Sequence, residues 1–140
     1  MANRGGPYTL YQSTTDGVNF VDLGWTSGAT GAVPASYPGG TGWNRTSDEI
    51  KSVTRTGTGA YTIALAGPWY AAMARFQAWT LQATYANTGV CTVYIVEDHS
   101  TNTTTPELKI LTTNAAGTAT DMATTDQINL TFGLVIKPSY

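Results

Sequence analysis

The residues that could transfer protons are concentrated in one short run. The only histidine, His99, belongs to the run Glu-Asp-His-Ser at residues 97–100. A hydrolytic triad uses Asp, His and Ser, but it draws them from distant segments, and consecutive side chains rarely aim at one another. A solvated loop over residues 98–106 explains the Asp, His and Ser, so the sequence predicts no catalytic role for them.

Three pairs of carboxylates lie close together in the chain, and paired carboxylates can cleave glycosidic bonds. The pairs are Asp48/Glu49, Glu97/Asp98 and Asp121/Asp126. Adjacent residues of a strand point to opposite faces, which argues against the first two pairs. The third pair lies in a polar connection, where a weak calcium site is an alternative to a turn. The regular spacing of a calcium-binding loop is absent, so we expect a turn and no metal.

Glycine and cysteine motifs add no cofactor site. The glycine-rich run at residues 39–42 lacks the Lys-Ser/Thr and the helix of a phosphate-binding loop. Cys91 is the only cysteine, so no disulfide can form within the chain, and its apolar neighbours predict a small buried residue. The sequence therefore predicts a protein that is not an enzyme and binds no cofactor.

The fraction of charged residues and the net charge limit the classes of partner that the chain is expected to bind. Charged residues make up 11% of the 140 residues, against about 25% in ordinary soluble domains. This indicates a surface covered partly by other proteins, although a neutral surface rich in Thr is an alternative. The net charge is −2 and the basic residues are scattered, so no nucleic-acid partner is expected. No secretory signal or membrane span is visible, which predicts synthesis in a cytoplasm and no membrane partner.

The elements that would position these residues are short strands, because apolar residues alternate with period two between turns. The predicted strands are residues 50–55 and 60–65 as one hairpin, 74–86 and 90–96 as a second, and 128–136 as the strongest strand. A short helical turn within residues 69–78 is an alternative there. So many short strands predict an all-β fold, an antiparallel sandwich, jelly roll or barrel.

The same alternation predicts the buried faces. The expected core residues are Tyr61, Ile63, Leu65, Trp79, Leu81, Ala83, Tyr85, Val93, Ile95, Ile128, Leu130, Phe132, Leu134 and Ile136.

The first third of the chain has a different character. Residues 1–47 are rich in Gly, Pro and aromatic residues, and we expect an extended N-terminal arm and a Gly/Pro-rich loop that cross a neighbouring subunit, with residues 48–140 as the β domain. The alternative is that this part adds one or two strands to the same domain, followed by a long loop. Large apolar side chains outside regular strands predict a partner interface. They are Tyr8, Leu10, Tyr11, Phe20, Trp25, Trp43, Trp69 and Tyr70.

Two runs of the β domain resemble small virion proteins of tailed bacteriophages. They are IKSVTRTGTGAYTI at residues 50–63, and GTATD at residues 117–121 followed by INLTF at residues 128–132. The group most similar in type is the capsid decoration, or cement, proteins. The resemblance implies a β-barrel or jelly-roll domain on the outside of a capsid, often a trimer, which bridges major capsid subunits and stiffens the shell. It carries over no catalytic motif.

The sequence thus predicts a non-enzymatic virion structural protein, made in the bacterial host cytoplasm and located on the capsid surface. Its expected partners are the major capsid protein and copies of itself, with a homotrimer favoured. The alternatives are a phage tail or fibre component, and a carbohydrate-binding module that uses exposed aromatic side chains.

Overall fold

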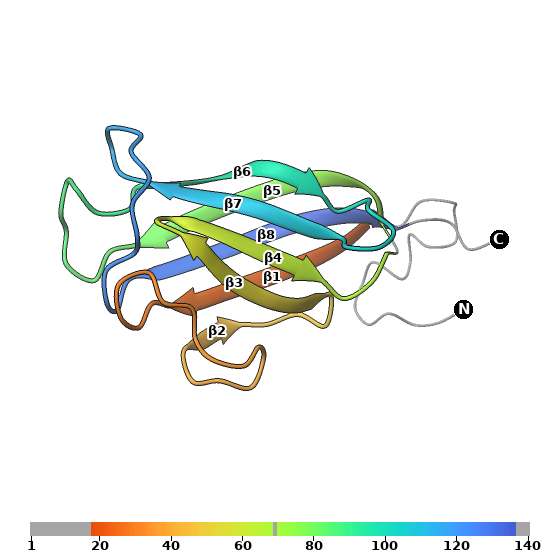
Figure 1. The fold of residues 1–140 in the computed structure, drawn as a ribbon, viewed down its shortest axis with the longest axis horizontal. Helices are drawn as coiled ribbons and strands as arrows, with labels where there is room; N and C mark the ends of the chain where they lie inside the picture. Colours follow the sequence, from red (N-terminus) through yellow and green to blue (C-terminus); the bar gives the residue numbers. More distant parts are fainter. Residues whose placement is uncertain (1–17, 69, 137–140) are drawn as a thin grey trace.

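The structure, a computed structural model, describes residues 18–68 and 70–136. In these ranges the chain forms strands and no helix, so none of the described residues belongs to a helix that could cross a membrane. The strands are β1 (Val18–Thr26), β2 (Trp43–Arg45), β3 (Ile50–Gly57), β4 (Ala60–Leu65), β5 (Tyr70–Leu81), β6 (Thr92–His99), β7 (Glu107–Thr113) and β8 (Gln127–Ile136) (Figure 1). The predicted all-β class is confirmed.

The strands form two antiparallel sheets that pack face to face. Sheet 1 has the order β2-β1-β8-β5 and sheet 2 has the order β3-β4-β7-β6. The fold is therefore a β sandwich, one of the three architectures expected from the sequence. The last strands of the two sheets, β5 and β6, lie on the same side of the sandwich (Figure 1).

One of the two predicted hairpins is present. Strands β3 and β4 pair across a tight turn in which Gly59 has a φ of +65°, a conformation that favours glycine. The second hairpin is wrong, because β5 pairs with β8 in sheet 1 whereas β6 pairs with β7 in sheet 2. The connection between them crosses from one sheet to the other. The helical turn considered for residues 69–78 is also wrong, since strand β5 occupies this stretch from Tyr70.

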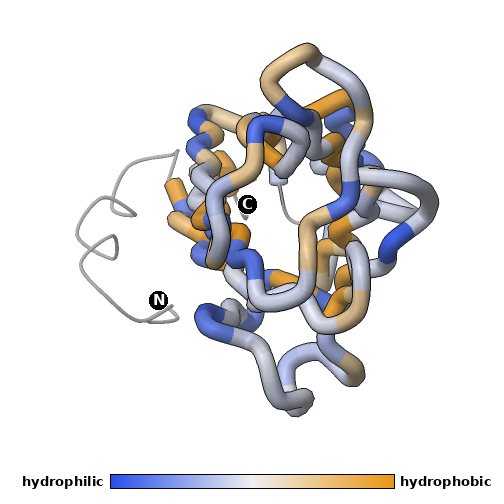
Figure 2. Tube along the Cα trace, turned by 90° about the vertical axis from the view of Figure 1, so that its left-hand side faces the viewer, coloured by the Kyte–Doolittle hydropathy of each residue, from blue (hydrophilic) through white to orange (hydrophobic). Residues whose placement is uncertain are grey.

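The core lies between the sheets and contains alternate residues of the strands, as the pleat of a strand requires. Its buried hydrophobic residues, none more than 4% exposed, are Val21, Leu23, Trp25, Ile50, Tyr61, Ile63, Leu65, Tyr70, Val90, Leu108, Ile110, Met122, Ile128, Leu130, Phe132 and Leu134. The predicted buried faces of β4 and β8 are confirmed. Figure 2 looks onto the loops at one end, and many of the hydrophobic stretches lie behind them in the strands.

Trp25 joins the two sheets. Its ring lies 5.5 Å from the ring of Tyr61 in sheet 2, edge to face, and 5.9 Å from the ring of Trp43 in β2. Aromatic pairs in this geometry contribute roughly 0.5–1.5 kcal/mol beyond the burial of their surface. Trp25 and Trp43, two of the tryptophans predicted as interface residues, therefore help to hold the sandwich together.

Residues 18–47 belong to the β domain, which corrects the boundary expected at residue 48. Strand β1 lies inside sheet 1 and pairs with β8 along its whole length. The following loop is tied down as well, since the N–H of Gly31 donates to Met122 O at 2.8 Å and the Tyr37 hydroxyl donates to Ser47 O at 2.9 Å. Residues 18–47 therefore follow the alternative stated for the first third of the chain, in which it adds strands to the β domain and then forms a long loop. The remaining part of the expected arm, residues 1–17, lies outside the described residues.

Candidate functional site

His99 and its neighbours form a surface ion-pair cluster. They end strand β6 instead of forming the expected loop. Glu97 Oε2 lies 2.7 Å from Lys109 Nζ and 3.6 Å from His99 Nε2, and the hydrogen bond from Lys109 lowers the pKa of the Glu97 carboxyl. Asp98 accepts a hydrogen bond from the N–H of Ser100 at 2.9 Å. His99 thus faces Glu97, Asp98 binds a backbone N–H, and the buried Ser100 Oγ has no hydrogen-bond partner, so the three side chains form no proton relay.

Asp121 is held by groups from the β3–β4 hairpin. Arg55 donates to both carboxylate oxygens, from Nε at 2.9 Å and from Nη2 at 2.6 Å, and the N–H of Gly59 donates at 2.8 Å. The hydrogen bond from Arg55 is the main cause that holds the pKa of the Asp121 carboxyl below its ordinary value. This carboxylate fixes the connection before β8 onto sheet 2.

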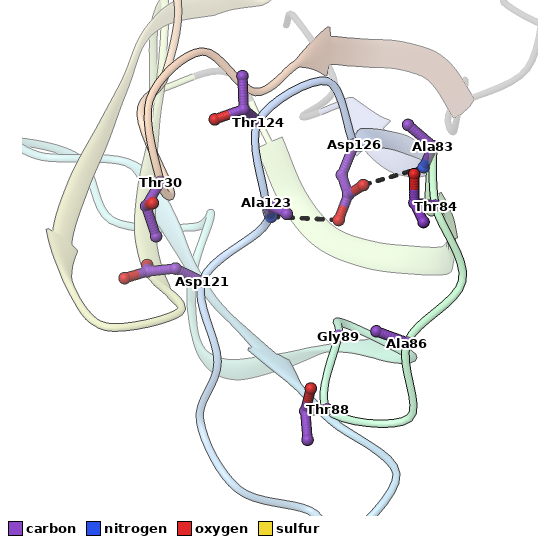
Figure 3. A pocket seen from close by; sticks show the side chains of 10 residues that line it. All are labelled: Thr30, Ala83, Thr84, Ala86, Thr88, Gly89, Asp121, Ala123, Thr124 and Asp126. Atoms are coloured by element: carbon purple, nitrogen blue, oxygen red, sulfur yellow. Dashed lines mark hydrogen bonds between the residues drawn. The ribbon is translucent and has the colours of Figure 1, made fainter.

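Asp126 fixes a second connection. It is 3% exposed and accepts hydrogen bonds from the N–H of Ala83 at 3.0 Å and from that of Ala123 at 3.1 Å. Figure 3 shows that the Asp121 carboxyl group points away from Asp126. Both residues line an open depression of about 510 Å³, whose other lining residues are Thr30, Ala83, Thr84, Ala86, Thr88, Gly89, Ala123 and Thr124. The two carboxylates are used as turn anchors, in agreement with the turn favoured from the sequence.

The remaining carboxylate pair is also divided between different roles. Glu49 accepts hydrogen bonds from the Asn19 amide and the Ser47 hydroxyl, whereas Asp48 is exposed. Across residues 18–68 and 70–136, no three His, Cys, Asp or Glu side chains gather in a way that could hold a metal ion. The calcium alternative therefore finds no support in this part of the chain.

The predicted interface residues that the structure describes do not gather on one surface. Trp25 and Tyr70 are 0% and 1% exposed, so the folded domain cannot offer them to a partner, and the prediction is corrected for both. Trp43 is half-buried, and its ring lies 4.8 Å from that of Tyr37. Phe20 is 54% exposed on the outer face of sheet 1 and stays a candidate. The predicted residues outside the described ranges are Tyr8, Leu10, Tyr11 and Trp69.

A different apolar surface lies on the two edge strands that share one side of the sandwich. On β5, Trp79 and Leu81 are 51% and 52% exposed, and on β6, Tyr94 and Val96 are 41% and 50% exposed. Arg75 is the one charged residue between positions 70 and 96 of the sequence. Trp79 and Leu81 lie on the outer face of sheet 1 and Tyr94 and Val96 on the outer face of sheet 2, whereas the half-buried Met73, Phe76, Val93 and Ile95 pack against the core between them. We call this side of the sandwich, from one outer face round to the other, the β5–β6 surface.

The sequence pattern assigned β5 to the opposite face. The sequence places Trp79, Leu81, Ala83 and Tyr85 in the core, and this is wrong, since all four are exposed. The inward phase contains Phe76, Ala78 and Thr80, which lie opposite the buried Phe132, Leu130 and Ile128 of β8. Two register irregularities near the start of β5 shift the alternation. No local signal in the sequence marks them.

Two further expectations fail at the end of this strand. Tyr85 is 79% exposed, because β5 ends at Leu81 and the chain turns towards sheet 2. Cys91 is exposed instead of buried, since it lies in the connection just before β6, where its Sγ is 3.4 Å from Gly89 O. The crossing between the sheets places both residues outside the core.

Comparisons with known proteins found no match, whether with protein-family models, with curated proteins or with solved structures.

Proposed function

We propose that this chain is a non-enzymatic virion structural protein that binds the outer surface of a tailed-bacteriophage capsid and stabilises it. The proposed partner is the major capsid protein. The resemblance of residues 50–63, 117–121 and 128–132 to decoration proteins supports a place in a phage particle, and the carboxylates that anchor turns support a structural role. A sandwich with one continuous core provides a rigid body for bridging capsid subunits.

The observation that carries this proposal is the β5–β6 surface. Aromatic residues are enriched where proteins meet, and charged residues are depleted at the centre of such contacts. Here four large apolar side chains flank one side of the sandwich, two on the outer face of each sheet, in a stretch that holds a single charge. A protein partner that covers these side chains would remove their apolar area from water, at roughly 25 cal/mol per Å².

Co-sedimentation with expanded capsids of the encoding phage tests this role. The double variant Tyr94→Lys/Val96→Lys is expected to bind at least about tenfold more weakly, a change of about 1.4 kcal/mol, because it buries two charges in the contact. The matched control Thr54→Lys/Thr58→Lys adds the same charge at exposed positions at the far edge of sheet 2 and should bind as the wild type. Failure of the wild type to bind capsids would exclude the role, and binding to purified tails instead would identify a tail or fibre component.

The N-terminal arm is tested by deletion of residues 1–17. The deletion stops there because Val18 begins a strand inside sheet 1. We expect the truncated chain to remain folded and to bind capsids more weakly. Unchanged binding by a folded, truncated chain would limit the capsid contact to the β domain.

One observation favours a carbohydrate-binding module as a second candidate. Trp79 lies opposite Asn129 of β8, and Leu81 lies opposite Gln127, so an exposed indole and two amides share the outer face of sheet 1. Asn129 Nδ2 is a buried donor without a hydrogen-bond partner. A glycan-binding screen with the wild type and Trp79→Ala distinguishes this candidate. Specific binding that is lost in the variant would support it, and absence of any glycan binding would rule it out.

A further inference from the structure

A sandwich of two four-stranded sheets has four edge strands, here β2, β5, β3 and β6. An edge strand presents unpaired N–H and C=O groups that can pair with another chain. Natural proteins block such pairing with very short strands, bulges, or charged side chains on the edge. The four edges of this chain differ strongly in these features.

Three of the edges are blocked. β2 has only three residues. β3 carries register irregularities near both ends and the exposed charges of Lys51 and Arg55. β6 has an irregularity between Ile95 and Glu97, and its last residues include two exposed acids, Glu97 and Asp98.

The fourth edge, β5, is open. From Arg75 to Leu81 it pairs with β8 residue by residue without an irregularity. Among the described residues β8 is its only strand partner, and none of them forms a strand on the other side of residues 75–81. The stretch holds one charge, at its first residue, and exposes Trp79 and Leu81. It combines the length, regularity and low charge that favour edge pairing.

We propose that residues 75–81 pair antiparallel with the same residues of a second copy, about a two-fold axis at Ala78. This register pairs all seven residues of the regular stretch. It places Gln77 opposite the partner's Trp79, and Arg75 opposite the partner's Leu81. The two sheets then join into one continuous sheet of eight strands across the dimer.

The charge pattern of residues 75–81 favours a second copy of the chain as the partner that pairs with the β5 edge. The two-fold axis separates the two Arg75 residues by six positions, about 20 Å along the strands, well beyond the Debye length of about 8 Å at physiological salt. Like charges therefore do not meet, and no acidic or basic peptide is needed to balance the edge. A two-fold contact is closed, so it uses up the one unblocked edge and leaves no open edge for fibre growth.

Self-association of this kind goes beyond the capsid role and does not depend on it. The resemblance to decoration proteins implies a trimer, whereas pairing about a two-fold axis requires an even number of copies. The solution mass distinguishes the two arrangements. Light scattering after size exclusion should give twice the mass of one chain, and a monomer or a trimer would overturn the proposal.

Charge variants test which edge is used. Gln77→Lys/Trp79→Lys brings four lysines together in the dimer and should give a monomer with an unchanged circular dichroism spectrum. The matched control Tyr94→Lys/Val96→Lys adds the same charge to β6 and should remain dimeric, even where it no longer binds capsids. A dimer that survives the β5 substitutions would refute the pairing.

A cysteine placed on the axis tests the register without altering charge. In a Cys91→Ser background, Ala78→Cys brings two thiols opposite each other, with Cβ atoms about 4.5–5.5 Å apart, close to the span of a disulfide. Mild oxidation should give a covalent dimer on a non-reducing gel, whereas Val96→Cys in the same background should give none. Equal cross-linking at the two positions, or none at residue 78, would contradict the proposed register.

Discussion

Asp121 shows how one side chain can hold two parts of the sandwich together. It is 12% exposed, and its hydrogen bonds to Arg55 and Gly59 join the connection before β8 to the β3–β4 hairpin. Its folded-state pKa is lowered, so the stabilisation is complete above the ordinary Asp pKa of about 3.9 and is lost as the pH falls through the folded value. We expect Asp121→Asn to lower the free energy of unfolding by about 1–3 kcal/mol at neutral pH.

Urea denaturation at neutral pH and at about pH 2 checks the sign of this effect. The difference between the wild type and Asp121→Asn should be largest at neutral pH and should shrink in acid, where the wild-type carboxylate is itself protonated. Asp48→Asn removes an exposed carboxylate and is the control, with an expected change within about 0.5 kcal/mol. A difference for Asp121→Asn that grows in acid would refute the assigned role of the carboxylate.

At the scale of elements, the faces of β8 and β5 predict opposite outcomes for one substitution. Leu130 of β8 is 1% exposed and Leu81 of β5 is 52% exposed. Leu130→Ala should therefore cost about 2–5 kcal/mol, the range for a buried leucine. Leu81→Ala should cost less than about 1 kcal/mol. Chemical denaturation of both variants checks the pair, and a Leu81→Ala cost as large as that of Leu130→Ala would mean that β5 is turned with its outer face inward.

These two strands also show how far a sequence can predict this fold. β8 is predictable because it lies between two strands and its apolar face, with Phe132 and Leu134, contacts the core without interruption. β5 is not, because it alternates apolar residues on both faces, and Trp79 gives the stronger signal on the face that is exposed. Choice of partner is also hidden, since β5 pairs with β8, about 50 residues away, instead of with its neighbour β6. The sequence also did not predict the β5–β6 surface, because its pattern places Trp79 and Leu81 in the core.

At the scale of the whole molecule, the boundary of the folded domain depends on long-range pairing. Residues 1–47 have one composition, yet β1 within them pairs with β8 at the other end of the sequence. Composition indicates local character, whereas membership of a sheet is decided by partners more than a hundred residues away. The first residues that can be removed without loss of the core are therefore those before Val18.

Two truncations test this boundary. Deletion of residues 1–17 should preserve a single cooperative unfolding transition, because all strands of both sheets remain. Deletion of residues 1–26 also removes β1, with the buried Val21, Leu23 and Trp25, and opens sheet 1 between β2 and β8. At about 2–5 kcal/mol for each buried side chain, the three core residues alone contribute roughly 6–15 kcal/mol, comparable with the roughly 5–15 kcal/mol of a typical domain, and the lost strand ladder adds to this. Circular dichroism during heating should show a cooperative transition for the first truncation and none for the second. A cooperative transition for the second would mean that β1 is dispensable and that the whole of residues 1–47 acts as an arm.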